Sequence, residues 1–270
     1  MVESDSAFTG SIPEFYDTYL VPLIFEQYAE DLAARVVELP SASVLEIAAG
    51  SGVVTRAVAP RLATDAQYVV TDLNLPMLDH AASRQGDDAR ISWQQADALN
   101  LPFDDEMFDV VLCQFSVMFF PDRVAGYTEA RRVLKDGGSF LFNVWDDIEF
   151  NAFADVITQA VAGVFPDDPP QFLTRTPYGY HDEALIRGDL MEAGFVEVDF
   201  STVESISSAA AARDPAVAFC QGTPLRNEIE ARDASLLEHS TKCAADAIAA
   251  RFGSTNISAK IRGLVIKATR

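Results

Sequence analysis

Short apolar runs alternate with stretches of helical periodicity along the first half of the chain. One of them, F-D-V-V-L-C-Q-F, is continuous, which is typical of a central parallel strand covered on both faces. In the last, A-R-R-V-L-K-D-G-G-S-F-L-F-N-V-W, we expect a helix end, a stop at Gly137-Gly138 and then another strand. The pattern predicts an α/β domain. The segments that carry the predicted strands are Val44–Thr55, Tyr68–Asp72, Ile91–Leu101, Phe108–Phe115 and Ala130–Trp145.

The segment Val44–Thr55 has the pattern of a strand that ends in a tight turn and opens a helix. Its apolar run ends at Glu46, small residues follow, and Gly50 and Gly52 precede an apolar helix start. Glycine permits the dihedral angles of such a turn and lets a ligand approach the backbone. The helix directs unpaired N–H groups and a positive dipole end at that ligand. The turn is therefore a candidate nucleotide-cofactor site, although an ordinary strand–helix turn has the same pattern.

The spacing of this turn argues against a dinucleotide. A pyrophosphate-binding fingerprint is G-x-G-x-x-G, whereas no glycine stands three residues beyond Gly52. Glu46 is badly placed against a pyrophosphate, because like charges at close range repel. It is well placed against a cation, such as an amino group or, through water, a sulfonium-bearing amino acid.

Carboxylates follow the next two predicted strands. Asp72 lies twenty positions after Gly52, where a carboxylate accepts hydrogen bonds from both hydroxyls of a ribose. Asp97 is positioned to accept the exocyclic amine of an adenine, while the backbone N–H of Ala98 reaches a ring nitrogen. Further residues are expected to border the same crevice, either on the adenine face or at the end of the fourth predicted strand. These are Leu73, Asn74, Met77, Cys113, Gln114 and Phe115.

Taken together, these segments resemble the class I S-adenosylmethionine (SAM)-dependent methyltransferases. More narrowly, they resemble the small-molecule branch with ubiquinone/menaquinone-biosynthesis-type enzymes, called methyltransferase type 11. The resemblance covers roughly residues 40–146, and two positions depart from the family pattern: Ala48 stands for its first glycine and Asp136 for its proline. The matching motifs are L-E-I-A-A-G-S-G, V-T-D-L-N, Q-A-D-A-L-N-L-P-F, F-D-V-V-L-C-Q-F and R-R-V-L-K-D-G-G.

The resemblance implies a Rossmann-like, doubly wound sheet of seven mostly parallel strands, with the last strand antiparallel. It implies SAM as cofactor, S-adenosylhomocysteine as product, and binding at Glu46, Ala48, Gly50, Gly52 and Asp72. We expect one methyltransferase domain over residues 1–270, with helical insertions that form a lid. Its parts are an N-terminal helical cover (1–39), the SAM-binding core (40–146), a lid insertion (147–181) and the remaining sheet (182–270) with a helical insertion (207–256).

Residues outside the core are expected to handle the substrate. In the resembled family leading helices fold over the cofactor, so Tyr16 and Tyr19 would touch the methionyl carboxylate or the substrate; plain core packing explains the same aromatic stripe. Tyr178 and Tyr180 of the lid, with Phe115, are substrate candidates. A general base is needed only for an acceptor whose proton has a high pKa. His181 is the candidate for it, and a surface residue beside a helix cap is the alternative.

Composition restricts the partners. The formal net charge is −21, from 41 acidic and 20 basic residues, which argues against nucleic acid as a partner because binding it requires a basic surface. No apolar run is long enough to span a membrane, and the acidic N-terminus lacks a signal-peptide pattern. The three cysteines form no C-x-x-C pair and suit a reducing, cytoplasmic location, and no metal-ligand spacing occurs.

The sequence thus predicts methyl transfer from SAM to a small apolar or aromatic acceptor, mainly by proximity and orientation. Two alternatives stay open: an NAD(P)-dependent oxidoreductase on a similar sheet, and a non-catalytic SAM-binding protein. The acceptor, the methylated atom and the oligomeric state are not predicted.

Overall fold

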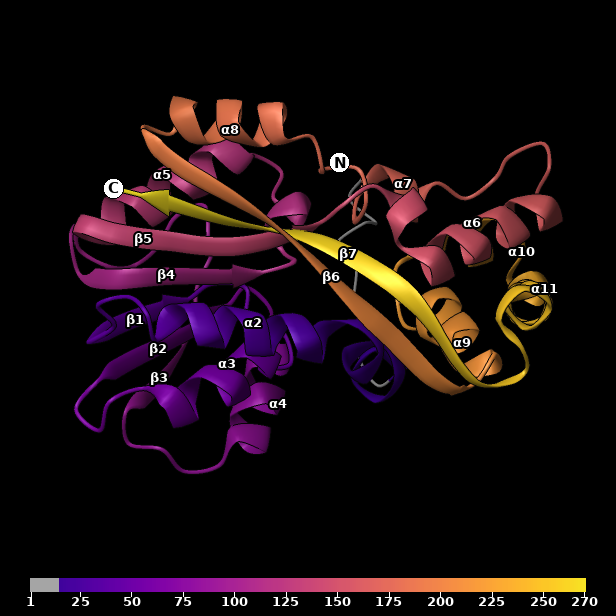
Figure 1. Ribbon diagram of the computed structural model, residues 1–270, viewed down its shortest axis with the longest axis horizontal. Helices are drawn as coiled ribbons and strands as arrows, with labels where there is room; N and C mark the ends of the chain where they lie inside the picture. Colours follow the sequence, from indigo (N-terminus) through magenta and orange to yellow (C-terminus); the bar gives the residue numbers. More distant parts are fainter. Residues whose placement is uncertain (1–14) are drawn as a thin grey trace. The chain divides into compact units, whose positions relative to one another are not determined.

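The computed structural model describes residues 15–270 and contains a mixed β-sheet with helices (Figure 1). The strands are β1 (Ser43–Glu46), β2 (Gln67–Asp72), β3 (Ile91–Gln95), β4 (Phe108–Gln114), β5 (Leu134–Trp145), β6 (Glu197–Ala211) and β7 (Thr255–Thr269). The longer helices are η2 (Tyr16–Phe25), α2 (Glu26–Val36), α3 (Val53–Val58), α4 (Leu75–Gln85), α5 (Arg123–Val133), α6 (Ala152–Val164), α8 (Glu183–Glu192), α9 (Arg213–Gln221), α10 (Leu225–Asp233) and α11 (Leu237–Phe252). Shorter turns of helix are η3 (Ala59–Arg61), η4 (Val117–Phe119), η5 (Ile148–Phe150), α7 (Phe172–Arg175) and η6 (Ala234–Leu236).

Within the described residues the sheet has seven strands in the order β3-β2-β1-β4-β5-β7-β6. The pairs β1–β2, β1–β4, β2–β3 and β4–β5 are parallel. β7 is antiparallel to β5. The N–H of Arg270 donates to the carbonyl of Gly138, and the N–H of Asp146 donates to the carbonyl of Arg262, so residue numbers rise along one strand while they fall along the other. Figure 1 shows the opposite directions of the β4 and β7 arrows. The predicted α/β class, with seven mostly parallel strands and an antiparallel last strand, is confirmed.

The described residues form two compact units. One contains Glu26–Val144, His181–Thr202 and Leu264–Arg270, and therefore the parallel strands together with α2 to α5 and α8. The other contains the residues up to Phe25, Trp145–Tyr180 and Val203–Gly263. We call them the sheet unit and the helical unit. The assignment of the whole chain to a single domain stays a prediction.

Aromatic side chains fill one face of the sheet unit. Phe140 and Phe142 alternate along β5 and stack with ring centroids 4.7 Å apart, and both contact Tyr127 of α5. α5 begins where the Asp122 carboxylate accepts the Ala125 N–H at 2.9 Å, which satisfies a donor of its first turn. It ends at Val133, so the predicted stop at Gly137-Gly138 is wrong; both glycines lie within β5.

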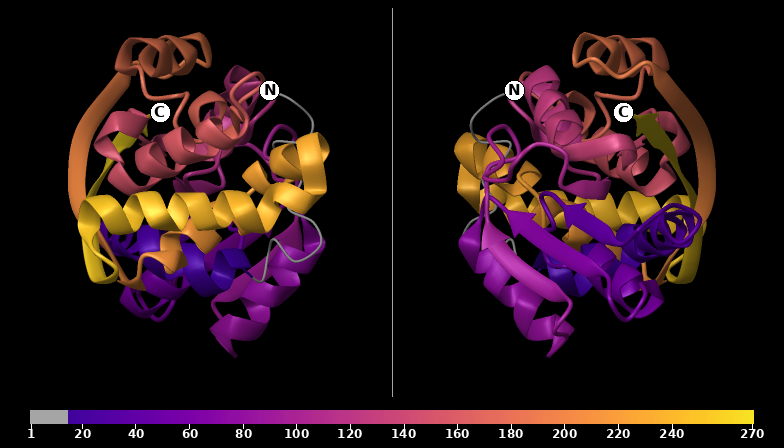
Figure 2. Two further views of the ribbon diagram at one scale, coloured as in Figure 1. Left: turned by 90° about the vertical axis from the view of Figure 1, so that its right-hand side faces the viewer. Right: turned by 90° about the vertical axis from the view of Figure 1, so that its left-hand side faces the viewer.

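The helical unit packs α11 against α6 and α9; Figure 2 shows α11 as the long yellow helix. Phe153 of α6 meets Phe252 of α11 edge to face, with centroids 5.2 Å apart. The predicted helical insertion 207–256 is too long at both ends, because β6 continues to Ala211 and β7 begins at Thr255. The end of β6 is rich in alanine, which favours helix, but pairing with the neighbouring strand of the sheet holds it extended.

The first described helix, η2, is a π-helix that contains Pro22 and leads directly into α2. Residues 1–14 of the predicted N-terminal cover lie outside the described residues.

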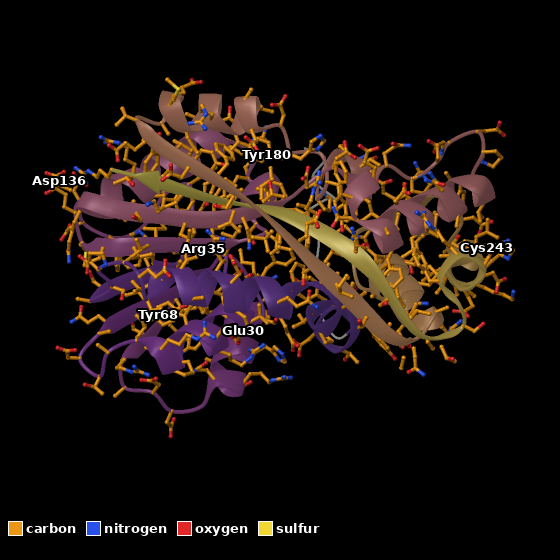
Figure 3. The ribbon with its side chains drawn as sticks, in the orientation of Figure 1. Glu30, Arg35, Tyr68, Asp136, Tyr180 and Cys243 are labelled. Carbon is orange, nitrogen blue, oxygen red and sulfur yellow. The ribbon has the colours of Figure 1, made fainter. Side chains whose placement is uncertain are left out.

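The three cysteines are free and differ in exposure. Cys113 of β4 and Cys220 of α9 are fully buried. Burial raises the pKa of the Cys220 thiol to about 12, and burial also raises the pKa of Cys113. Cys243, labelled in Figure 3, is partly exposed on α11.

Candidate cofactor site

The turn between β1 and α3 passes through the left-handed backbone region. Ala48, Gly50 and Gly52 have φ of +53°, +56° and +76°. This left-handed region favours glycine, because a Cβ there crowds the following carbonyl. The turn is tied to the adjacent strands by the N–H of Ile47, which donates to the carbonyl of Leu112 at 2.9 Å. The alanine that departs from the family pattern thus occupies a position that favours glycine.

Gly52 is required for a second reason. A Cβ placed on Gly52 would lie 2.8 Å from the Cβ of Ala81 on α4, whereas a Cβ on Gly50 would meet nothing within 4 Å. The absence of a side chain at Gly52 therefore allows α3 and α4 to pack closely.

Glu46 is buried at the end of β1, with 2% of its surface exposed. Its Oε2 accepts hydrogen bonds from Thr55 Oγ1 of α3, at 2.7 Å, and from the hydroxyl of Tyr68 on β2. Burial raises the pKa of Glu46 from 4.5 to about 7, against the lowering effect of these two hydrogen bonds. Sequence reasoning assigned Glu46 to a cofactor cation. The structure shows its contacts with protein hydroxyls, and the cofactor contact stays a prediction.

Tyr68 was missed as a partner of Glu46. It is labelled in Figure 3, lies on β2 and is fully buried. In the register of the parallel pair Tyr68 lies opposite Val44, two residues before Glu46, so both side chains point to the same face of the sheet. The sequence shows which residues of each strand share a face, but only the register between β1 and β2 shows that Tyr68 and Glu46 lie together.

Asp72 connects the turn to the end of β2. Its Oδ2 accepts the N–H of Gly50 at 2.8 Å and its Oδ1 accepts the N–H of Asn74 at 2.7 Å. The residue is 8% exposed, and burial raises the pKa of its carboxyl group. The structure therefore brings together Gly50 and Asp72, which sequence reasoning had assigned to the same cofactor. Each carboxylate oxygen retains a further lone pair that can accept a ligand hydroxyl.

The segment after β2 presents an exposed apolar residue beside this carboxylate. Leu73 is 66% exposed, and Asn74 caps α4 by accepting the N–H of Met77 at 3.3 Å. The segment after β3 is linked to it, because the N–H of Ala96 donates to the carbonyl of Asp72. The predicted adenine contacts Leu73 and Asn74 therefore follow Asp72 directly at one edge of the sheet.

Asp97 and Ala98 lie just beyond β3. The Asp97 side chain is exposed and its Oδ1 accepts the N–H of Leu99 at 2.9 Å, while Ala98 is 9% exposed. Their contact with an adenine stays a prediction.

The end of β4 lies beside the turn, because β4 pairs with β1. Cys113 is buried there, Gln114 is half-buried and Phe115 is 5% exposed. The N–H of Phe115 donates to Oδ1 of Asn143 on β5 at 2.9 Å, and its ring packs edge to face on Tyr28 of α2. Sequence reasoning missed Asn143 and Tyr28, because neither belongs to a recognisable motif.

The other predicted site residues stand apart from this group in the chain. Tyr16 and Tyr19 lie on η2, while Tyr178 and Tyr180 are each 3% exposed. All four belong to the helical unit; Tyr180 is labelled in Figure 3. His181 is half-buried directly before Asp182, which caps α8. The proposed roles of these five residues stay predictions.

Residues 15–270 contain neither a metal-binding cluster nor a helix able to span a membrane. This part of the chain holds no cluster of three or more histidine, cysteine, aspartate or glutamate side chains arranged to bind a metal ion. None of its helices combines the length and the apolar character that crossing a membrane requires.

Comparison with known proteins places this geometry in a family. Residues 45–142 match the model of a methyltransferase domain. The chain is 29% identical over 175 residues to the ubiquinone/menaquinone biosynthesis C-methyltransferase UbiE of Idiomarina loihiensis, covering 59% of this chain and 68% of that protein. It is 30% identical over 166 residues to UbiE of Chromobacterium violaceum, covering 58% of this chain and 68% of the relative.

A solved structure is similar over nearly its full length. A putative methyltransferase from Bacillus halodurans superposes with a TM-score of 0.57 at 22% identity, covering 89% of this chain and 97% of that one. The strand order, the antiparallel β7 and this structural likeness show the class I methyltransferase fold. The chain belongs to the class I SAM-dependent methyltransferases, to their UbiE-like type. It is therefore an enzyme of SAM-dependent methyl transfer.

Proposed function

We propose that this chain binds SAM at the turn between β1 and α3 and transfers its methyl group to a small apolar or aromatic molecule. The observation that carries the proposal is the position of Asp72, whose carboxylate accepts the N–H of Gly50 and lies beside the exposed Leu73. A ribose hydroxyl pair on Asp72 and an adenine on Leu73 would together span the carboxyl ends of β1 and β2. In open α/β sheets ligands bind at that edge.

SAM supplies an activated methyl group on a sulfonium, so this chain's residues chiefly have to align the acceptor and exclude water. Orientation of this kind contributes about 7–11 kcal/mol to lowering a barrier. The side chains around the turn are suited to that role: Glu46 and Tyr68 are buried and hydrogen-bonded, and Phe115 is held by α2 and β5. Such a preorganised edge needs little rearrangement when ligands bind.

For the acceptor we propose a reduced quinone ring that is methylated on carbon. The relatives named above are C-methyltransferases of ubiquinone and menaquinone biosynthesis, which supports this class. The acidity of the chain supports a small molecule over a nucleic acid. We also propose a cytoplasmic location, which the three free cysteines support, because thiols stay reduced there.

The cofactor is tested by calorimetric titration with S-adenosylhomocysteine. We expect micromolar binding by the natural chain and a loss of about 1–3 kcal/mol in Asp72→Ala, because a charge-assisted acceptor is removed. Asp105→Ala is a matched control, since Asp105 is an exposed carboxylate of the same unit. Unchanged affinity in Asp72→Ala would show that the ribose is bound elsewhere. NAD(P) binding in place of S-adenosylhomocysteine would overturn the proposal.

The acceptor is tested with tritium-labelled SAM and a reduced naphthoquinone. Label in the organic phase, on a ring carbon, is the expected result. Label on a ring oxygen would contradict carbon methylation.

A further inference from the structure

The chain leaves β4 through a backbone conformation that phenylalanine rarely adopts. Phe115 has φ of +47°, and Ala48, just beyond the end of the neighbouring strand β1, has φ of +53°. Residues with a Cβ are disfavoured in this region, and such strain persists where the surroundings enforce it, often at ligand-binding sites. Glu46 and Leu112 pair in register on the two strands, so both strained residues lie at one edge of the sheet.

Asn143 of β5 holds this conformation. The N–H of Phe115 donates to Oδ1 of Asn143 at 2.9 Å and to its backbone carbonyl at 3.2 Å. On the other side the Phe115 ring packs against Tyr28, with ring centroids 5.0 Å apart and planes at 83°. The backbone and the ring of Phe115 are therefore fixed from two different elements, β5 and α2.

The same turn reaches the cofactor site through Ser116. Its hydroxyl lies 3.0 Å from the carbonyl of Gln114 and 3.4 Å from the carbonyl of Ala48, and donates to one of them. A change in the conformation of Phe115 would therefore move a group that borders the β1–α3 turn.

The amide of Asn143 is kept at a cost in stability. Asn143 has no exposed surface, and its Nδ2 has no hydrogen-bond partner within the described residues. A buried donor without a partner costs free energy that an apolar residue of similar shape would avoid. Protein stability alone therefore does not explain an asparagine at this position, whereas the hydrogen bond from Phe115 does.

We propose that Asn143 is a positioning residue for methyl transfer, which holds the Phe115 turn in its left-handed conformation and so shapes the acceptor side of the site. It acts through Phe115 and does not itself touch the reacting atoms. The inference rests on the function proposed above. It predicts that Asn143 affects the rate of methyl transfer more than cofactor binding or stability.

Two substitutions separate positioning from packing. Asn143→Leu removes both the accepting oxygen and the unpaired donor at similar volume, and Asn143→Asp retains an accepting oxygen. Ser139→Ala is the control, because Ser139 is a buried polar residue in the middle of β5, four residues before Asn143. Each protein is assayed for melting temperature, S-adenosylhomocysteine affinity, and kcat and KM with reduced naphthoquinone.

For Asn143→Leu we expect kcat to fall about tenfold or more, with KM and cofactor affinity within about threefold of the natural protein. Its melting temperature should stay equal or rise, because the unpaired donor is gone. Asn143→Asp should recover most of the lost kcat, and Ser139→Ala should behave as the natural chain.

Natural kcat in Asn143→Leu would overturn the inference, and so would parallel losses of kcat and melting temperature in both variants. If the natural chain fails to bind S-adenosylhomocysteine, the proposed function itself is wrong. If it binds but does not methylate the reduced naphthoquinone, the proposed acceptor class and this role of Asn143 are both wrong.

Discussion

Gly52 offers a quantitative test of the turn, because a side chain there meets two separate obstacles. A left-handed φ of +76° costs a residue with a Cβ about 1–2 kcal/mol. The new Cβ would also lie 2.8 Å from the Cβ of Ala81, and overpacking of this kind costs about 1–3 kcal/mol. Gly52→Ala should therefore lower the free energy of unfolding by about 2–5 kcal/mol.

Gly50→Ala is the matched comparison. Gly50 has φ of +56° but nothing within 4 Å of an added Cβ, so only the backbone cost of about 1–2 kcal/mol applies. The double variant Gly52→Ala/Ala81→Gly removes the overlap. It should recover about 1–3 kcal/mol of the Gly52→Ala loss, after correction for about 1 kcal/mol that glycine costs within α4.

The assay is urea unfolding followed by circular dichroism on the natural chain and four variants: Gly50→Ala, Gly52→Ala, Ala81→Gly and the double variant. A double-mutant cycle isolates the coupling between Gly52 and Ala81. Equal losses in Gly50→Ala and Gly52→Ala, together with zero coupling, would refute the close packing of α3 on α4. The same proteins titrated with S-adenosylhomocysteine would show whether the turn's conformation matters for binding separately from stability.

Three further outcomes are expected around the same turn. Because burial raises the pKa of Glu46 from 4.5 to about 7, the folded state binds more protons than the unfolded chain between these pH values, and the free energy of unfolding should fall by about 3 kcal/mol as the pH rises through this range. Glu46→Gln should flatten this pH dependence in melting curves. An unchanged slope would contradict a buried, protonatable Glu46. Tyr68→Phe removes a donor to the buried carboxylate and should lower the free energy of unfolding in urea by about 1–3 kcal/mol, more at high pH than at low pH. A loss of stability that does not depend on pH would point to packing instead. Ala48→Gly relieves a φ of +53° but adds chain entropy to the unfolded state, so it should stabilise by about 1 kcal/mol or less, and a lower melting temperature would count against strain at Ala48.

The sequence predicted the positions of residues that depend on order along the chain. Glu46 and Asp72 end β1 and β2, and Gly50 and Gly52 lie in the turn before α3, as the short apolar runs indicated. The structure links Gly50 to Asp72 by a hydrogen bond, and the contacts of these residues with a cofactor stay predictions. The sheet followed from the same runs and from the family resemblance.

What the sequence did not reveal depends on pairing between distant segments. Tyr68 meets Glu46, and Asn143 meets Phe115, only because β1 pairs with β2 and β4 with β5 in a particular register. The extension of β6 to Ala211 was missed for a related reason, since local alanine content favoured helix while strand pairing decided the outcome.

The three cysteines give this protein a built-in set of chemical reporters. Cys243 is accessible, whereas Cys113 lies in the sheet unit and Cys220 in the helical unit, both buried with raised thiol pKa values. A thiol reagent should therefore label one site at once and the other two only when the segment around each one opens. The two slow labelling rates would measure the opening of each unit separately, without any mutation. Adding S-adenosylhomocysteine should slow labelling in the unit whose opening the ligand suppresses.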